Sequence, residues 1–299
     1  MRDGLCFASS GADNRLIVRV ICFCVLLVSM QSAAQDAPKL NAALNEQVVM
    51  LPIGSGGMKL ETTIFKPDGD GPFPLVVINH GKASGNPRFQ GRATYPVASA
   101  VFVRLGYLVA LPMRQGFSKS EGGYVEPGCN IASNGLMQAE DLRRTLDTLV
   151  KRPDVDPAQI LVIGQSHGGL TTIAFGSGDP FPGVKGLINF AGGFKMTNCQ
   201  WDLALISAFE KYGRTSKIPT LWFYGDNDSY WGPTAEIPTR MYEAYTKAGG
   251  RAKLIAFGRF DAGDAHSMFT RREGREIWLA PVMEFLQQIG LPNKEPGRP

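Results

Sequence analysis

A single serine set among glycines is the residue of this sequence best placed to do chemistry. Ser166 lies in the stretch GQSHGG of residues 164–169, which follows the apolar run 160–163 and precedes the segment 170–175. Strand, G-x-S-x-G and helix in this order predict a nucleophile elbow, a sharp turn that lifts the serine hydroxyl above a sheet. Neighbouring glycines let the backbone and the following helix pass close by. The pattern therefore predicts that Ser166 acts as a nucleophile.

A serine is a weak nucleophile until a neighbouring base takes its proton, and a carboxylate usually orients that base. The sequence has 3 histidines, so the candidates are few. His167 adjoins the serine, which directs its side chain elsewhere, and His80 ends a predicted strand. His266 lies between the last predicted strand and the last predicted helix, where the base stands when the chain order is serine, acid, histidine. We predict that His266 is the general base.

The acid is expected at the end of the strand that follows the nucleophile unit. The predicted strand 220–224 leads into Gly225, Asp226, Asn227 and Asp228. Asp228 has room to turn back toward the histidine loop, whereas Asp226 follows the glycine directly and can cap the turn through an Asx-type bond. The spacing favours Asp228 and leaves Asp226 as the alternative. The other acids considered are expected to be solvated or to cap turns: Asp202, Asp261 and Asp264.

Negative charge on the carbonyl oxygen requires two hydrogen-bond donors that are fixed before the reaction. One is expected to be the backbone N–H of His167, the residue after the nucleophile. The other is expected in the loop after the predicted strand 75–79, where Gly81 lets the backbone turn an N–H inward. We predict that Lys82 provides this second donor to the oxyanion hole.

Two further features are expected to shape a substrate pocket. Segment 192–218 is long for a connection and is predicted to contain a short helix, 203–212. It is a candidate small cap over the site, with a structural insertion as the alternative. Core packing is an equally weighted alternative for the side chains next to the acid and the base. The residues predicted to line the pocket are Tyr230, Trp231, Met268 and Phe269.

The elements that must hold these residues alternate along the chain. From residue 75 on, strands and helices follow one another, which predicts an α/β fold with a mostly parallel central sheet and helices on both faces. Residues 35–299 are expected to form one domain. Strands are predicted at 48–52, 60–65, 75–79, 107–111, 160–163, 186–191, 220–224 and 253–257. Helices are predicted at 95–105, 133–151, 203–212, 234–248 and 275–289.

These pieces resemble the α/β-hydrolase fold, and within it the dienelactone hydrolase-like and acyl-peptidase-like enzymes. The resemblance spans residues 48–289 and lies in the His80-Gly81 pair, the stretch RQGFS of 114–118, the elbow, Asp228 and His266. It implies cleavage of esters, lactones, amides or peptides by a serine nucleophile without a cofactor.

One residue departs from the resemblance. A dienelactone hydrolase proper has a cysteine nucleophile, whereas this chain has Ser166. This difference favours esterase-like activity on a small ester or acyl substrate. The alternatives are a serine peptidase or amidase of the same fold and a non-catalytic binding protein that retains the fold.

The first residues have the layout of an export signal. Arg15 and Arg19 precede the apolar run 20–28, and small residues follow, which predicts a secretory signal over residues 1–34 with cleavage after Ala34. As a helix the run rises only about 14 Å, well short of a hydrocarbon core of about 30 Å. Export to the periplasm or the medium, without stable membrane insertion, is therefore expected; an uncleaved anchor is the less favoured alternative.

Cysteine usage agrees with export. Of the 5 cysteines, three (6, 22 and 24) lie in the predicted signal, which leaves Cys129 and Cys199. A pair of cysteines in an oxidising compartment predicts a disulfide. Two unrelated thiols are the alternative.

Composition excludes some partners. The formal net charge is +4 and the basic residues are scattered, so no nucleic-acid surface is expected. No cluster of ligands with metal-site spacing is present in the sequence, and no metal or cofactor is expected. The sequence leaves the oligomeric state, the acyl group and the leaving group open.

Overall fold

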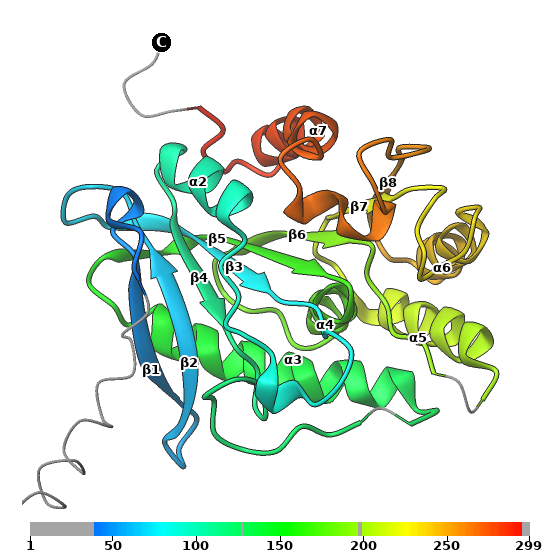
Figure 1. The fold of residues 1–299 in the computed structure, drawn as a ribbon, viewed down its shortest axis with the longest axis horizontal. Helices are drawn as coiled ribbons and strands as arrows, with labels where there is room; N and C mark the ends of the chain where they lie inside the picture. The colour runs from blue at the N-terminus through cyan, green and yellow to red at the C-terminus, as the bar shows by residue number, and fades with distance from the viewer. Residues whose placement is uncertain (1–38, 127, 197–198, 295–299) are drawn as a thin grey trace, which may run out of the picture. The chain divides into compact units, whose positions relative to one another are not determined.

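Eight strands form one sheet at the centre of the protein (Figure 1). The computed structural model describes residues 39–126, 128–196 and 199–294. Strand order is β1-β2-β4-β3-β5-β6-β7-β8, with β1/β2 and β2/β4 antiparallel and all later neighbours parallel. This confirms the prediction of a mostly parallel sheet. The strands are β1 (Gln47–Ile53), β2 (Met58–Phe65), β3 (Phe73–Asn79), β4 (Leu108–Pro112), β5 (Val155–Gln165), β6 (Val184–Phe190), β7 (Thr220–Tyr224) and β8 (Ala252–Ala256).

Helices cover both faces of this sheet, which confirms the predicted layering. Helices α2 and α7 lie on one face, and α3, α4, α5 and α6 on the other (Figure 1). Leu75 and Val77 of β3 enter one core and Val76 and Ile78 the other, because successive side chains of a strand point to opposite faces. The helices are α2 (Pro96–Arg104), α3 (Ile131–Leu149), α4 (His167–Gly176), α5 (Trp201–Thr215), α6 (Glu236–Lys247) and α7 (Arg275–Gln288), with short 3₁₀ turns η1 (Ala42–Leu44), η2 (Pro87–Phe89) and η3 (Ala265–Thr270).

Helix α3 shows how the local sequence sets an element. The Asn130 side chain caps its first turn by accepting the N–H of Ser133 at 3.1 Å. Leu142 and Leu146, four residues apart, are buried on one face, as an amphipathic helix requires. The helix ends at Leu149 and packs against α4. It therefore supports the helix that begins directly after Ser166.

The segment expected to form a cap takes a different place. Helix α5 is longer than the predicted helix 203–212, and it buries Leu205, Phe209 and Tyr212 in the core that α3 and α4 share. Its apolar face packs against α3, α4 and α6, and Phe209 meets Trp222 of β7. The helical part of 192–218 thus packs in the helical layer, which is the structural insertion that the sequence analysis gave as the alternative to a cap.

The predicted disulfide is present. Cys129 and Cys199 are bonded, with their Cα atoms 6.0 Å apart. The bond links the loop before α3 to the loop before α5. Two distant parts of the chain, both next to helices that pack against α4, are held together in this way.

The described residues from Asn41 onward form one compact unit. The predicted signal at 1–34 lies outside the described residues. Among the helices that the structure describes, none combines the length and the apolar character needed to cross a bilayer.

Candidate active site

Ser166 stands on a strained turn between β5 and α4. Its backbone angles are φ 56° and ψ −126°, in a region that residues with a side chain rarely adopt. A Cβ on Gly164 would lie 2.1 Å from the carbonyl oxygen of Gly168, and one on Gly168 would lie 2.1 Å from that of Asn79. Only glycine fits at these two positions. The turn therefore has the tight strand-to-helix geometry that the G-x-S-x-G pattern predicts.

Two hydrogen bonds join Ser166, His266 and Asp228. The Nε2 atom of His266 lies 2.9 Å from Oγ of Ser166, and its Nδ1 atom lies 3.0 Å from Oδ2 of Asp228. An ionised carboxylate only accepts, so Nδ1 bears the proton and Nε2 is free to accept from the serine hydroxyl. Ser166 follows β5, Asp228 follows β7 and His266 follows β8. The carboxyl ends of these parallel strands lie at the same edge of the sheet.

Asp228, not Asp226, faces the histidine. The Asp228 side chain is buried, and its Oδ1 atom also accepts the N–H groups of Tyr230 and Trp231 at 2.8 and 3.2 Å. Asp226 is exposed, and its backbone N–H bonds to the carbonyl of Gly258. The structure brings the favoured of the two candidate acids to His266.

Asp264 ties the loop of the histidine to the loop of the acid. Its Oδ1 atom accepts the N–H of His266 at 2.9 Å and the N–H of Ser229 at 3.0 Å, and its Oδ2 atom accepts the Ser229 hydroxyl. Burial raises the pKa of this carboxyl, but the hydrogen bonds outweigh burial and hold the pKa below its usual value. Asp264 caps η3, as sequence analysis expected for it, and it also joins two loops that meet at Ser166.

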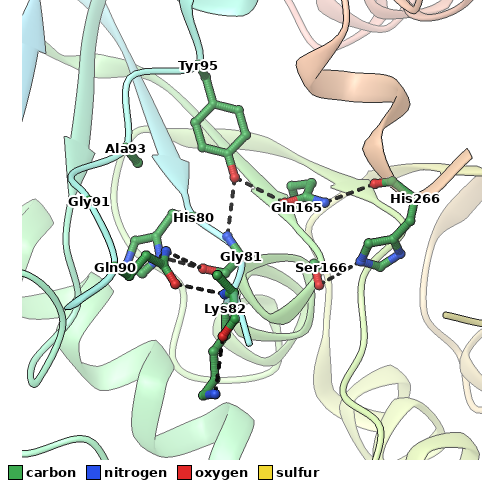
Figure 2. Close-up of a pocket in the computed structure, with 11 residues that line it drawn as sticks. His80, Gly81, Lys82, Gln90, Gly91, Ala93, Tyr95, Gln165, Ser166 and His266 are labelled. Carbon is green, nitrogen blue, oxygen red and sulfur yellow. Dashed lines mark hydrogen bonds between the residues drawn. The ribbon is translucent and has the colours of Figure 1, made fainter. Parts of the chain in front are cut away.

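A cavity of about 320 Å³ opens beside Ser166 (Figure 2). Its walls are the loop 80–83, the segment 90–95, Gln165 and His266. The size is at the lower end of the range of small-molecule pockets, about 300–1,000 Å³. Within the part of the chain that the structure describes, no three His, Cys, Asp or Glu side chains gather in a way that could hold a metal ion.

Two backbone N–H groups at the elbow have no hydrogen-bond partner among the described residues, those of Lys82 and His167. His167 is the first residue of α4, and the first N–H groups of a helix have no partner within it. Lys82 lines the cavity with Ser166, and a Cβ on the preceding Gly81 would lie 3.2 Å from Cβ of Ser166. Both predicted oxyanion donors are thus next to the nucleophile and unpaired.

The other two histidines are buried and neutral. The Nε2 atom of His80 accepts the N–H of Arg114 at 3.1 Å, and Nε2 of His167 lies 2.9 Å from Oδ1 of Asn134. Burial, and then the charge of Arg114, lower the pKa of both imidazoles well below the usual value. Burial also lowers the pKa of Arg114 to about 10. These rings pack and hydrogen-bond, and only His266 has its ring on the serine hydroxyl.

None of the four residues predicted to line the pocket is among those that line the cavity beside Ser166, and they divide into two groups. Tyr230 stacks on His266 with ring centroids 5.0 Å apart, and Trp231 lies next to it with Nε1 on the Ala191 carbonyl. Met268 and Phe269 instead point into the core, where Phe269 stacks on Phe190 at 3.9 Å. The η3 turn directs Met268 and Phe269 inward, so both take the core packing that the sequence analysis weighted equally with pocket lining.

Three polar residues at the site were not predicted. Gln90, Tyr95 and Gln165 line the cavity and hydrogen-bond to the backbone of residues 81–83 or to that of His266 (Figure 2). Gln165 directly precedes the serine in G-x-S-x-G, so the motif indicated that this side chain lies near the site, although the motif does not specify the residue type there. Nothing in the local sequence marks Gln90 or Tyr95.

The fold of this chain is similar to that of several proteins of known structure. No protein-family model matches the sequence. An esterase of Pyrococcus furiosus has a similar structure, with a TM-score of 0.59 and 18% identity over 85% of this chain and 94% of that one. A Klebsiella pneumoniae protein named as a dienelactone hydrolase matches with a TM-score of 0.58 and 16% identity, over 81% of this chain and 98% of its own. An acylaminoacyl peptidase of Pyrococcus horikoshii matches with a TM-score of 0.57 and 19% identity, over 85% of this chain and 43% of its own. The strand order, the elbow and these likenesses together show that the chain has the α/β-hydrolase fold.

Proposed function

We propose that this protein is a serine hydrolase that cleaves carboxylic ester bonds of small molecules. The observation that supports this most is the unbroken hydrogen-bonded series from Ser166 through His266 to Asp228. It offers a nucleophile, a base that can take its proton and a carboxylate that stabilises the resulting imidazolium. The cavity beside Ser166 gives a substrate carbonyl access to the hydroxyl.

In the first step, Oγ of Ser166 attacks the carbonyl carbon while its proton moves to Nε2 of His266. Asp228 keeps Nδ1–H in place and stabilises the charge on the ring. The carbonyl electron pair moves onto oxygen, where the N–H groups of Lys82 and His167 receive it. A donor in such a position contributes roughly 2.7–4 kcal/mol to the transition state. When the carbonyl re-forms, the alcohol leaves with the proton from Nε2 and the acyl group stays on Ser166.

In the second step, water takes the place of the alcohol. His266 removes a proton from the water as it attacks the acyl carbon, and the same two N–H groups receive the oxyanion. The bond to Oγ of Ser166 then breaks, and the serine regains its proton from His266. Free acid is released and the enzyme returns to its starting state without any cofactor.

Two observations support small esters ahead of peptides as substrates. The cavity of about 320 Å³ is small, and it lies directly beside Ser166. The chain matches the Pyrococcus furiosus esterase over 94% of that protein, but the acylaminoacyl peptidase over 43%. We also propose export to the periplasm or the medium, which the signal pattern at 1–34 and the Cys129–Cys199 disulfide support.

The test is hydrolysis of p-nitrophenyl acetate, butyrate and octanoate by the protein expressed from the full sequence. Ser166→Ala and His266→Ala are measured beside it, with Ser55→Ala, an exposed serine in the β1–β2 turn, as the matched control. We expect near-complete loss in the first two variants and unchanged rates in the control. The preferred chain length reports the size of the acyl pocket.

Two results would overturn the proposal. Equal ester hydrolysis in all four proteins would exclude Ser166 and His266 from the chemistry. A folded parent that cleaves the p-nitroanilides of the same acyl groups but not the esters would support an amidase, and one that cleaves neither would support a binding protein.

A further inference from the structure

The N–H of Lys82 can receive an oxyanion only if the loop 80–83 holds it toward Ser166. This loop lies at the rim of the cavity, Ala83 is exposed, and its own sequence includes the flexible Gly81. We propose that Gln90 is the positioning residue for this loop, because its side-chain amide clamps the peptide groups on either side of Lys82. This role rests on the proposed function: Gln90 would affect catalysis by holding the Lys82 N–H in place, without touching the substrate carbonyl.

The clamp consists of two hydrogen bonds from one amide. The Nε2 atom of Gln90 donates to the carbonyl of Gly81 at 3.0 Å, and its Oε1 atom accepts the N–H of Ala83 at 2.8 Å (Figure 2). The pairing is the one that an amide requires, with its donor on a carbonyl and its acceptor on an N–H. Lys82 lies between these two peptide groups, and its own N–H has no hydrogen-bond partner among the residues that the structure describes.

A neighbouring imidazole also holds the carbonyl of Gly81. His80 Nε2 accepts the N–H of Arg114, so the ring proton is on Nδ1, which donates to the Gly81 carbonyl at 2.7 Å. The 3.3 Å approach of Gln90 Nε2 to the same Nδ1 therefore joins two donors and is not a hydrogen bond. The Gly81 carbonyl accepts from both His80 and Gln90, which fixes the peptide plane before Lys82.

Tyr95 and Arg114 hydrogen-bond to the first residues of the loop 80–83, and neither bonds to Ala83 at its end. The Tyr95 hydroxyl accepts the N–H of Gly81 at 3.2 Å, and Nη1 of Arg114 donates to the His80 carbonyl at 2.6 Å. On the far side of Lys82, the hydrogen bond from Ala83 to Gln90 is the one that ties the described backbone to another part of the site. The Lys82 ammonium donates to two carbonyls of its own loop, those of Ala83 and Gly85, and lies 5.5 Å from the centroid of the Tyr124 ring.

Gln90 is itself held on a braced turn. It follows η2, whose first turn is capped by the Asn86 side chain. The Arg88 guanidinium fastens this turn to the loop 118–122 by donating to the carbonyls of Ser118, Ser120 and Gly122. Three carbonyls on one planar guanidinium fix its direction, so the clamp has a rigid base. A residue that positions a catalytic group must itself be held in place, and the turn that bears Gln90 meets this requirement.

The test compares Gln90→Met and Gln90→Asn with the parent, Ser166→Ala and the control Gln287→Met, an exposed glutamine of α7. Methionine has similar bulk without hydrogen bonds, and asparagine keeps the amide but is one methylene too short. For both we expect kcat on p-nitrophenyl butyrate to fall roughly 10–100-fold, less than the 100–1,000-fold loss of an oxyanion donor, with KM and the thermal midpoint unchanged. The inhibition constant of a trifluoromethyl ketone, whose serine adduct has an oxyanion, should rise by the same factor.

The outcomes separate this inference from the proposed function. If the parent has no Ser166-dependent esterase activity, the proposed function fails first. If the parent is active and both Gln90 variants keep its kcat and its ketone affinity, the proposed function stands and the clamp is overturned. A fall in kcat that follows a fall in thermal midpoint, with ketone affinity and KM weakened equally, would assign Gln90 to stability alone and also overturn it.

Discussion

The carbonyl oxygen of His266 accepts a hydrogen bond from Nε2 of Gln165 at 3.0 Å. Gln165 directly precedes the candidate nucleophile, and its Oε1 atom accepts the Tyr95 hydroxyl at 3.1 Å. Tyr95 in turn holds the N–H of Gly81. One side chain therefore connects the elbow to the loop of the base and, through Tyr95, to the loop of the oxyanion donor.

Replacing Gln165 by methionine should reduce catalysis without unfolding the protein. The variant retains bulk but releases the carbonyl of His266, so the imidazole loses a constraint on its distance from Oγ. Misplacement of a catalytic group by about 1 Å costs up to 100-fold, and we expect kcat for p-nitrophenyl butyrate to fall roughly 10–100-fold. A kcat equal to that of Gln287→Met would show that the bond does not position His266.

The choice between the two candidate acids can be made with a pair of isosteric variants. Asp228→Asn places an amide against Nδ1 of His266 and favours the wrong tautomer, for which a loss of about 10⁴ in kcat is known in a serine protease. Asp226→Asn changes an exposed residue and should leave kcat unchanged. Steady-state ester hydrolysis measures both, and the opposite ranking would reassign the acid.

The elbow should not tolerate the smallest addition of volume. In Gly168→Ala the new Cβ meets the Asn79 carbonyl oxygen at 2.1 Å, and backbone atoms cannot move aside cheaply. We expect the free energy of unfolding in urea to fall by about 3 kcal/mol or more. Gly56→Ala is the control, because no atom lies within 4 Å of its Cβ. Equal stability of the two variants would contradict the tight contact between α4 and β3.

Buried neutral histidines should make the protein less stable in mild acid. Burial, with the charge of Arg114, lowers the pKa of His80 and His167 in the folded state, whereas the unfolded chain titrates near 6.5. Below that pH the unfolded state binds more protons, so stability falls as the pH falls, by up to about 1.4 kcal/mol per pH unit for each group.

Urea unfolding at pH 7.5, 6.5 and 5.5 measures this effect. His167→Gln should have a shallower pH dependence than the parent, because one buried group that resists protonation is gone. Identical slopes for the two proteins would mean that His167 takes up its proton equally well in both states.

Local rules were sufficient for much of the fold and for the core of the site. The apolar runs and helical periodicities predicted the strands and the layers, because strands buried on both faces and amphipathic helices leave clear patterns. Ser166 was marked by its glycines, and His266 by scarcity and by its place after the last strand. Asp228 was preferred over Asp226 on loop length, and the geometry brings Asp228 to the imidazole.

Side-chain direction and distant backbone contacts were beyond local rules. Met268 and Phe269 adjoin the base in sequence, yet the η3 turn points both into the core. Gln90 and Tyr95 act on backbone groups of residues 81–83, and a hydrogen bond to a peptide group leaves no signature in the side chains around it. Helix α5 had an apolar face in the sequence, but only the tertiary structure showed that it packs against α3, α4 and α6.

The Cys129–Cys199 bond also bears on how the chain matures. If residues 1–34 are removed as we propose, only these two of the 5 cysteines remain, and two thiols can pair in one way alone. Oxidation then has no mispaired isomers to sort, so a thiol oxidant should suffice and a disulfide isomerase should add nothing to the yield. A precursor that keeps Cys6, Cys22 and Cys24 has competing partners, and early oxidation could trap it before export.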